Sequence, residues 1–192
     1  MSAPDRRPRA ARDRLIDAAV DRFVHVGPGN ASWREVCAKA GATKGVVAHH
    51  FPGGKEELIV AAVERNAAQV DQLLARVIDR ADTPGEALVR FFDVYADLLD
   101  ADPDRGCPIA ASVADASATS DSVRVATARA FENWITAMTA LLGDEDVAAT
   151  VVAAMEGAIL LARATRDADL LRRTARVLAH HLLPAGPLFP AP

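Results

Sequence analysis

The residues between Ser32 and Phe51 have the types and spacing needed to contact a DNA duplex. Ser32 and Glu35 stand three positions apart, as in a capping box that opens a short helix. Gly41 follows at a turn, and the Thr43 side chain is placed to cap a second short helix. That helix has no acidic residue, so it can approach phosphates and base edges. The candidate contacts on it are Thr43, Lys44, Gly45, Val46, Ala48 and His49.

Small and apolar residues in this segment favour the tight packing of a helix-turn-helix. Gly41 can adopt the left-handed backbone conformation that the turn demands, and Cys37 keeps the helix crossing small. Val36 and Val47 are expected to close a small core with the preceding helix. The second helix would then face outward.

Charge is distributed unevenly along the chain. Residues 1–55 hold ten basic and five acidic side chains, whereas the whole chain has a net charge of -4, so the remainder is strongly acidic. A basic N-terminal block on an acidic body is typical of a phosphate-binding module joined to one that does not bind nucleic acid. A solvated basic tail is the alternative explanation, because four of the ten basic residues precede Arg14.

Several classes of protein are not indicated. The two cysteines, Cys37 and Cys107, suggest neither a disulfide framework nor a zinc site. Neither a signal peptide nor an uninterrupted apolar run of membrane-spanning length is evident, so we expect a soluble, cytoplasmic protein without a membrane partner. No catalytic constellation, cofactor motif or metal spacing is recognisable, so an enzyme is not predicted.

Apolar residues recur three or four positions apart almost throughout, which predicts an all-α chain of about nine helices. The expected helices span about residues 8 or 10 to 26, 32 to 41, 43 to 51, 55 to 80, 83 to 102, 109 to 115, 120 to 143, 145 to 165 and 168 to 183. We expect a DNA-binding domain at 1–54, a ligand-binding and dimerisation domain at 55–184, and a proline-rich tail at 185–192.

Polar, aromatic and sulfur-containing side chains at core-facing positions of the body are candidates for a ligand pocket. They are Tyr95, Cys107, Asn133, Trp134, Met138 and Glu156. Each could equally belong to an ordinary core, and Trp134 with Met138 forms a stripe that is typical of packing. Glu156 is a lone carboxylate in an apolar run. It would bind a cationic ligand or pair with Arg129 or Arg163.

Histidines and cysteines leave further alternatives open. His49 and His50 are adjacent, so they do not share a helical face, and no metal site is predicted there. His180 and His181 are interpreted as dimer-contact or surface imidazoles. Cys107 is either a redox or electrophile sensor or, more typically for a free cysteine, a small buried apolar residue.

The chain resembles the TetR family of transcriptional regulators. Over residues 10–60 the resemblance rests on Arg14-Leu15-Ile16-Asp17-Ala18-Ala19, Phe23, Gly27, Glu35, Gly41, Lys44-Gly45, His50-Phe51 and Lys55-Glu56-Glu57-Leu58. The segments Phe51-Pro52-Gly53-Gly54-Lys55 and Arg105-Gly106-Cys107-Pro108 are similar to its LmrA-like subgroup.

This resemblance implies a three-helix DNA-binding domain and a bundle whose last two helices form a homodimer. A small-molecule effector entering the bundle would shift the fourth helix and release the dimer from palindromic double-stranded DNA. Lys44 and Gly45 would lie near bases, and Thr43, His49, His50 and Lys55 nearer phosphates. The expected contacts also include Ser32, Trp33 and Arg34.

One departure concerns Ala48, where the family often has an aromatic residue. It puts one usual DNA contact in doubt and permits a second interpretation, a small helical ligand-binding protein that has lost DNA binding. A transcriptional activator is a further alternative to a repressor.

Overall fold

A computed structural model describes residues 11–182, which form nine helices and no strand. The helices are α1 (Ala11–Asn30), α2 (Trp33–Ala40), α3 (Lys44–His50), α4 (Gly54–Ile78), α5 (Pro84–Ala101), α6 (Pro108–Ala116), α7 (Asp121–Leu142), α8 (Glu145–Thr165) and α9 (Asp169–Leu182). The predicted all-α fold is confirmed. The expected start of the first helix before residue 11 and the tail at 185–192 lie outside the described residues.

Glycine and proline interrupt α1 where the sequence predicts its end. Gly27 has a φ of 72° and a ψ of 163°, outside the helical region, and Pro28 follows it. The regular helix therefore ends at Val26, and the residues up to Asn30 form a separate turn. A side chain at Gly27 or at Gly29 would collide with Asp115 of α6, so the glycines permit this close approach.

Backbone capping fixes the limits of α2 and α3. The Glu35 amide donates to Ser32 Oγ (3.2 Å) and the Ser32 amide donates to Glu35 Oε2 (3.3 Å), which confirms the capping box. Gly41 has a φ of 61°, so it is the left-handed turn residue that the sequence predicts. The expected cap at Thr43 is wrong. Its extended backbone precedes α3, but its hydroxyl accepts no hydrogen bond from that helix.

Caps also mark the ends of the longer helices. Thr83 Oγ1 accepts from the Glu86 amide (3.1 Å), but the Glu86 carboxylate accepts from the Asp82 amide (2.9 Å) and not from Thr83, so the motif is not a complete capping box. Ser120 is the residue that caps α7, through the Val123 amide (3.2 Å). Local hydrogen bonds therefore explain most helix limits.

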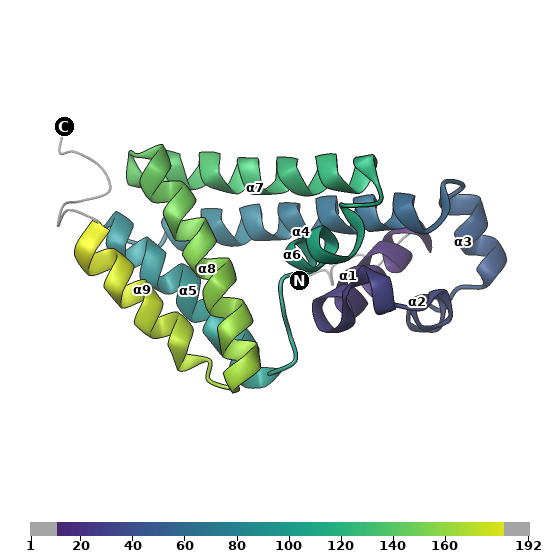
Figure 1. The fold of residues 1–192 in the computed structure, drawn as a ribbon, viewed down its shortest axis with the longest axis horizontal. Helices are drawn as coiled ribbons and strands as arrows, with labels where there is room; N and C mark the ends of the chain where they lie inside the picture. The colour runs from purple at the N-terminus through teal and green to yellow at the C-terminus, as the bar shows by residue number, and fades with distance from the viewer. Residues whose placement is uncertain (1–10, 183–192) are drawn as a thin grey trace, which may run out of the picture.

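The 25 residues of α4 connect the two ends of the molecule. Figure 1 shows α4 and α7 side by side along the long axis, with α2 and α3 at one end and α5, α8 and α9 at the other. We call α1 to α3 the head and α4 to α9 the body. One continuous apolar core runs through both, from Leu15 in α1 to Leu178 in α9.

Among residues 11–182, α8 is the one helix long and apolar enough to cross a membrane by length and composition. In the fold it packs against α7 and α9 as a core helix. Its remaining side still carries Leu160 and Leu161, whose side chains are 66% and 53% exposed. This leaves an apolar face of α8 without a partner in the monomer.

Hydrogen bonds join the end of α1 to the body. The Gly106 amide donates to the Val24 carbonyl oxygen (2.7 Å), and Arg163 Nη2 of α8 donates to the His25 carbonyl oxygen (3.2 Å). The His25 ring also contacts Asp102 (Nε2 to Oδ2, 2.6 Å). Since α1 also packs on α6, the head is attached to the body through several contacts around one helix end.

Candidate DNA-binding surface and ligand pocket

The exposed side of α3 brings the predicted DNA contacts together. Val47 of α3 and Phe51 just after it are buried, and they hold the helix against α1 and α2. Val46 and His50, which are next to these two buried residues in the chain, are half-buried. The remaining predicted residues in this segment are exposed or partly exposed to solvent: Thr43, Lys44, Gly45, Ala48 and His49.

The first turn of α2 adds a second part to this surface. Ser32 and Arg34 are exposed, whereas Trp33 is half-buried and packs against the core. Arg14 of α1 donates from Nε to the Ala40 carbonyl oxygen at the other end of α2 (3.1 Å). The orientation of α2 on α1 is therefore fixed at its C-terminal end by Arg14 and in its first turn by the hydrogen bond from Arg22 Nη2 to Glu35 Oε2 (3.3 Å).

A hollow of about 220 Å³ lies between α2 and α3 at the position of Ala48. Trp33, Lys44 and Phe51 are among its walls. The small side chain of Ala48 leaves this space open, at the position where the TetR-like pattern often has an aromatic residue. The departure in the sequence thus has a direct structural counterpart.

The basic side chains around α3 differ in how they are held. Lys55 Nζ donates to the Gly29 carbonyl oxygen (3.2 Å), so this side chain also binds the last turn of α1. The rings of His49 and His50 pack edge to face, with centroids 5.0 Å apart. Across residues 11–182 no group of three or more His, Cys, Asp or Glu residues is placed to hold a metal ion.

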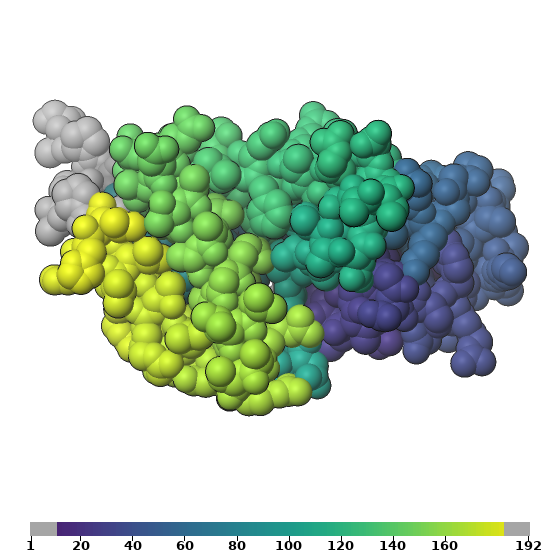
Figure 2. Space-filling view, viewed as in Figure 1, coloured from purple at the N-terminus to yellow at the C-terminus, as the bar shows by residue number. Residues whose placement is uncertain are grey.

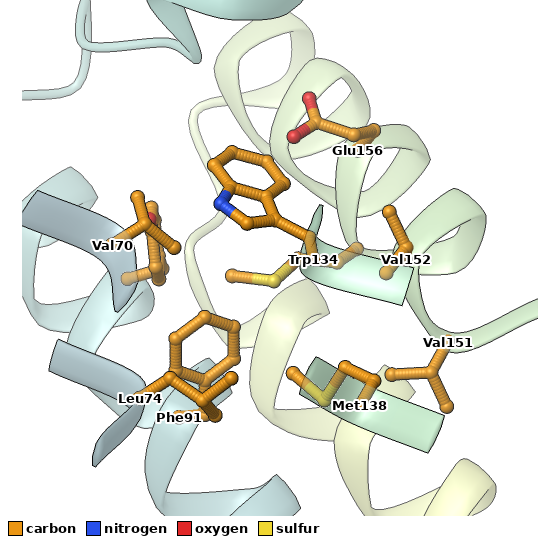
Figure 3. Close-up of a pocket in the computed structure, with 10 residues that line it drawn as sticks. Val70, Leu74, Phe91, Trp134, Met138, Val151, Val152 and Glu156 are labelled. Carbon is orange, nitrogen blue, oxygen red and sulfur yellow. The ribbon is translucent and has the colours of Figure 1, made fainter. Parts of the chain in front are cut away.

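A small, mostly apolar pocket lies in the body between α4, α5, α7 and α8 (Figure 3). Its volume is about 20 Å³, which is room for about one water molecule. Four of the six predicted ligand residues line it. The full lining is Val70, Leu74, Phe91, Tyr95, Trp134, Met138, Val151, Val152, Met155 and Glu156.

The other two predicted ligand residues lie elsewhere. Asn133 is exposed on α7, because one residue of helix turns its side chain about 100° away from that of Trp134. Including it among the pocket residues was wrong. Cys107 lines a separate, open cleft of about 520 Å³ between α1, α6 and α8. Glu156 lines both the pocket and this cleft.

Burial governs the electrostatics around Glu156. It raises the pKa of Glu156 to about 7, although a hydrogen bond from Cys107 acts in the opposite direction. Burial, followed by the charge of Glu156, also raises the pKa of the Cys107 thiol. The pKa of Tyr95 is raised mainly by burial. A cation brought to the Glu156 carboxylate would favour its ionised form.

The expected ion pair of Glu156 is not formed. Arg163 is directed to the His25 carbonyl oxygen, and neither Arg163 nor Arg129 is within salt-bridge distance of Glu156. The Trp134 indole N–H is also buried without an acceptor in the described part of the chain. The pocket is therefore lined by one carboxylate without an ion-pair partner and by one buried donor without an acceptor.

The open cleft is the feature that the sequence did not reveal. Its polar walls include His25 of α1, Asp115 of α6 and Arg163 of α8, which stand far apart in the chain. No short-range pattern connects these positions. The interruption at Gly27 was visible in the sequence, but the closeness of α6 to it was not.

Two family profiles match this chain. Residues 15–62 match the bacterial regulatory proteins of the tetR family, and residues 84–177 match the C-terminal domain of LmrA/YxaF-like transcriptional regulators. The first match covers most of the head and the start of α4. The second covers most of the body.

Individual proteins give the same picture over nearly the full chain. An uncharacterised HTH-type transcriptional regulator of Mycobacterium tuberculosis is 32% identical over 190 residues, covering 90% of this chain and 96% of that protein. The HTH-type transcriptional regulator LmrA of Bacillus subtilis is 28% identical over 170 residues, with 84% and 90% covered.

Solved structures share the fold at lower identity. Reduced NemR of E. coli has a TM-score of 0.79 at 18% identity, covering 92% of this chain and 99% of that one. A TetR regulator of Chloroflexus aurantiacus has a TM-score of 0.75 at 24% identity, with 89% and 93% covered.

Proposed function

Because this chain belongs to the TetR family of DNA-binding transcriptional regulators, we propose that it is a repressor that leaves its operator when a small molecule binds the body. Membership of this family implies DNA binding and transcriptional regulation. The relatives of this chain, LmrA among them, are named as transcriptional regulators and not as enzymes. Repression, the operator and the effector are the parts that we propose.

The outer face of α3 is the observation that carries this proposal. Buried Val47 and Phe51 fix the helix, and the exposed residues beside them are small or basic. We assign Lys44 and Gly45 to bases and Thr43, His49, His50 and Lys55 to phosphates. Ser32, Trp33 and Arg34 would contact the backbone from α2, because phosphate contacts orient a protein on the duplex.

Binding to the chain's own upstream DNA tests this assignment. Lys44→Ala should weaken binding by about 10- to 100-fold per half-site, while the circular dichroism melting curve stays unchanged. Arg76→Ala is a control, because that exposed cation lies near the far end of α4. Affinity of the wild type should fall as salt rises. Binding that ignores both salt and Lys44 would contradict the proposal.

We propose a homodimer formed through α8 and α9. Both helices expose large apolar side chains, Leu160 and Leu161 on α8 and Val177 on α9, which is 57% exposed. In Figures 1 and 2 these helices form the surface at the end of the molecule away from α2 and α3. A two-fold axis through this face would leave both heads available for a palindromic operator.

Leu161→Glu should convert this dimer to monomers in equilibrium sedimentation, because it places a charge in an apolar interface. Val125→Glu is the matched control, since Val125 on α7 is also an exposed apolar residue, 55% exposed, but lies on neither helix. If both variants remain dimeric, the interface lies elsewhere.

We further propose that residues 1–54 form the DNA-binding domain, 55–184 the effector and dimerisation domain, and 185–192 a tail. An effector held between α4, α5, α7 and α8 would move α4, and α4 continues directly from the head. A cytoplasmic location suits this role. Expression from the target promoter in a reporter strain that lacks the protein distinguishes repression from activation. Higher expression supports a repressor, and lower expression supports an activator.

A further inference from the structure

Two polar groups that line the pocket have little or no bonding within the described residues. The Glu156 carboxylate accepts a hydrogen bond from Cys107, a weak donor, and forms no ion pair with the arginines of α7 or α8. The Trp134 indole N–H has no acceptor within the described residues, although Trp134 is only 8% exposed. Such unsatisfied groups cost stability unless something else binds them.

Glu156 is also the residue through which the pocket meets the open cleft. The pocket of about 20 Å³ holds about one water molecule, but the cleft of about 520 Å³ is within the range of small-molecule sites. In Figure 3 the Glu156 carboxylate and the Trp134 indole lie at the same end of the pocket. A ligand entering by the cleft would reach the carboxylate first and the apolar walls next.

We propose that the effector is a monocationic amine with an apolar or aromatic body, whose ammonium group pairs with Glu156. The apolar body would press between Trp134 and Met138 and widen the pocket. This inference rests on the proposed effector-controlled function, since it names the chemical class that the same site would take. Glu156 has no ion-pair partner within the described residues, and for this reason we propose a positively charged effector.

None of the other titratable groups around Glu156 forms an ion pair with it. From α1, His25 contacts Asp102, and from α8, Arg163 donates to the His25 carbonyl oxygen. Tyr95 of α5 and Cys107 before α6 are held in their neutral forms by burial, which raises the pKa of each. Asp115 of α6 accepts from the Gly29 amide, and the charge of Arg105 acts on Tyr95 without forming an ion pair with Glu156.

The pH dependence follows from the carboxylate. Burial raises the pKa of Glu156 to about 7, so the group is largely protonated at pH 6 and largely ionised at pH 8. A primary amine stays cationic over this range, because its pKa is about 10. Amine binding should therefore strengthen with rising pH, by about tenfold between pH 6 and pH 8.

Calorimetry on the full-length free protein tests the proposal with 4-phenylbutylamine and 4-phenylbutanol, which share one carbon skeleton. At pH 8 the wild type should bind the amine at least about tenfold more tightly than the alcohol, as a charge-assisted contact predicts. Glu156→Gln should lose this preference and the pH dependence but keep its affinity for the alcohol. Glu132→Gln on the exposed surface of α7 should behave as the wild type.

Equal affinity for the two probes, binding of neither, or a preference that survives Glu156→Gln would each overturn the proposal. The assay contains no DNA, so its outcome does not depend on whether the protein binds an operator. A separate DNA titration with the amine then tests the proposed release. Tight amine binding without release would contradict the proposed function and leave the ligand class intact.

Discussion

On α3, Lys44 and His49 stand in solvent on a helix of seven residues, whereas Glu156 and Trp134 lie inside a pocket enclosed by four helices. Val47 and Phe51 are the residues that pack against the core in this segment, so Lys44 and His49 on the other side of α3 remain exposed. Trp134 is buried because the four helices meet around it, whereas Glu156 is half-buried because it also lines the open cleft.

Because of this difference, substitutions in the two regions should affect binding and stability differently. Under the proposed function, a substitution on the outer side of α3 changes the surface presented to DNA and leaves the core intact. A substitution in the pocket changes the interior itself, so ligand binding and folding respond together. Each of the following predictions tests one side of that contrast, from the largest expected effect to the smallest.

Replacing Phe51 by Ala should have the largest effect. Its ring is 1% exposed and the Arg12 guanidinium lies 5.2 Å from the ring centroid. Loss of this ring should lower the free energy of unfolding by about 3–5 kcal/mol in a denaturant titration. His49→Ala, two residues earlier and exposed, should change it by less than about 0.5 kcal/mol. A similar loss of unfolding free energy in both variants would contradict the division of this segment into a buried and an exposed side.

Glu156→Gln should change how stability depends on pH. The folded pKa of about 7 exceeds the ordinary value of 4.5, so the folded protein holds this proton more tightly than the unfolded chain. The contribution of Glu156 is most favourable below pH 4.5 and is lost as the pH rises towards and through 7. Relative to Glu156→Gln, the wild type should lose about 3 kcal/mol between pH 4.5 and pH 8, as measured by urea unfolding. Parallel pH profiles of the two proteins would show that the carboxylate is solvated.

Ala48→Tyr should have the smallest effect, a gain in DNA affinity of roughly three- to tenfold, the size of one added hydrogen bond. The ring would occupy part of the hollow of about 220 Å³ beside Trp33 and place a hydroxyl at the duplex. Fluorescence anisotropy with operator DNA measures the change. Ala48→Phe, which fills the same space without a hydroxyl, should gain less, and an unchanged or lower affinity for the tyrosine variant would argue against a DNA contact at this position.

Local chemistry made the head predictable to a large extent. Ser32 with Glu35, the left-handed Gly41 and the interruption at Gly27 act within a few residues of themselves, so they can be recognised in the sequence. One failure was also local in kind. Thr43 takes the extended cap conformation, but its hydroxyl accepts no hydrogen bond from α3.

The body was predictable in its helices but only partly in its site. Helical periodicity brought Tyr95, Trp134, Met138 and Glu156 to core-facing positions, and all four line the pocket. Asn133 was misplaced because in an alanine-rich helix many faces are apolar enough to pack, and the sequence does not fix the rotation of α7 to within one residue.

The sequence by itself determined where most helices begin and end and that two short helices joined at Gly41 follow α1, because caps and glycine turns act over a few residues. Only the tertiary structure decided that Glu156 stands between a small pocket and an open cleft and forms no ion pair among the described residues. That arrangement depends on how α1, α6, α7 and α8 pack, and packing sums many weak contacts between residues far apart in the chain.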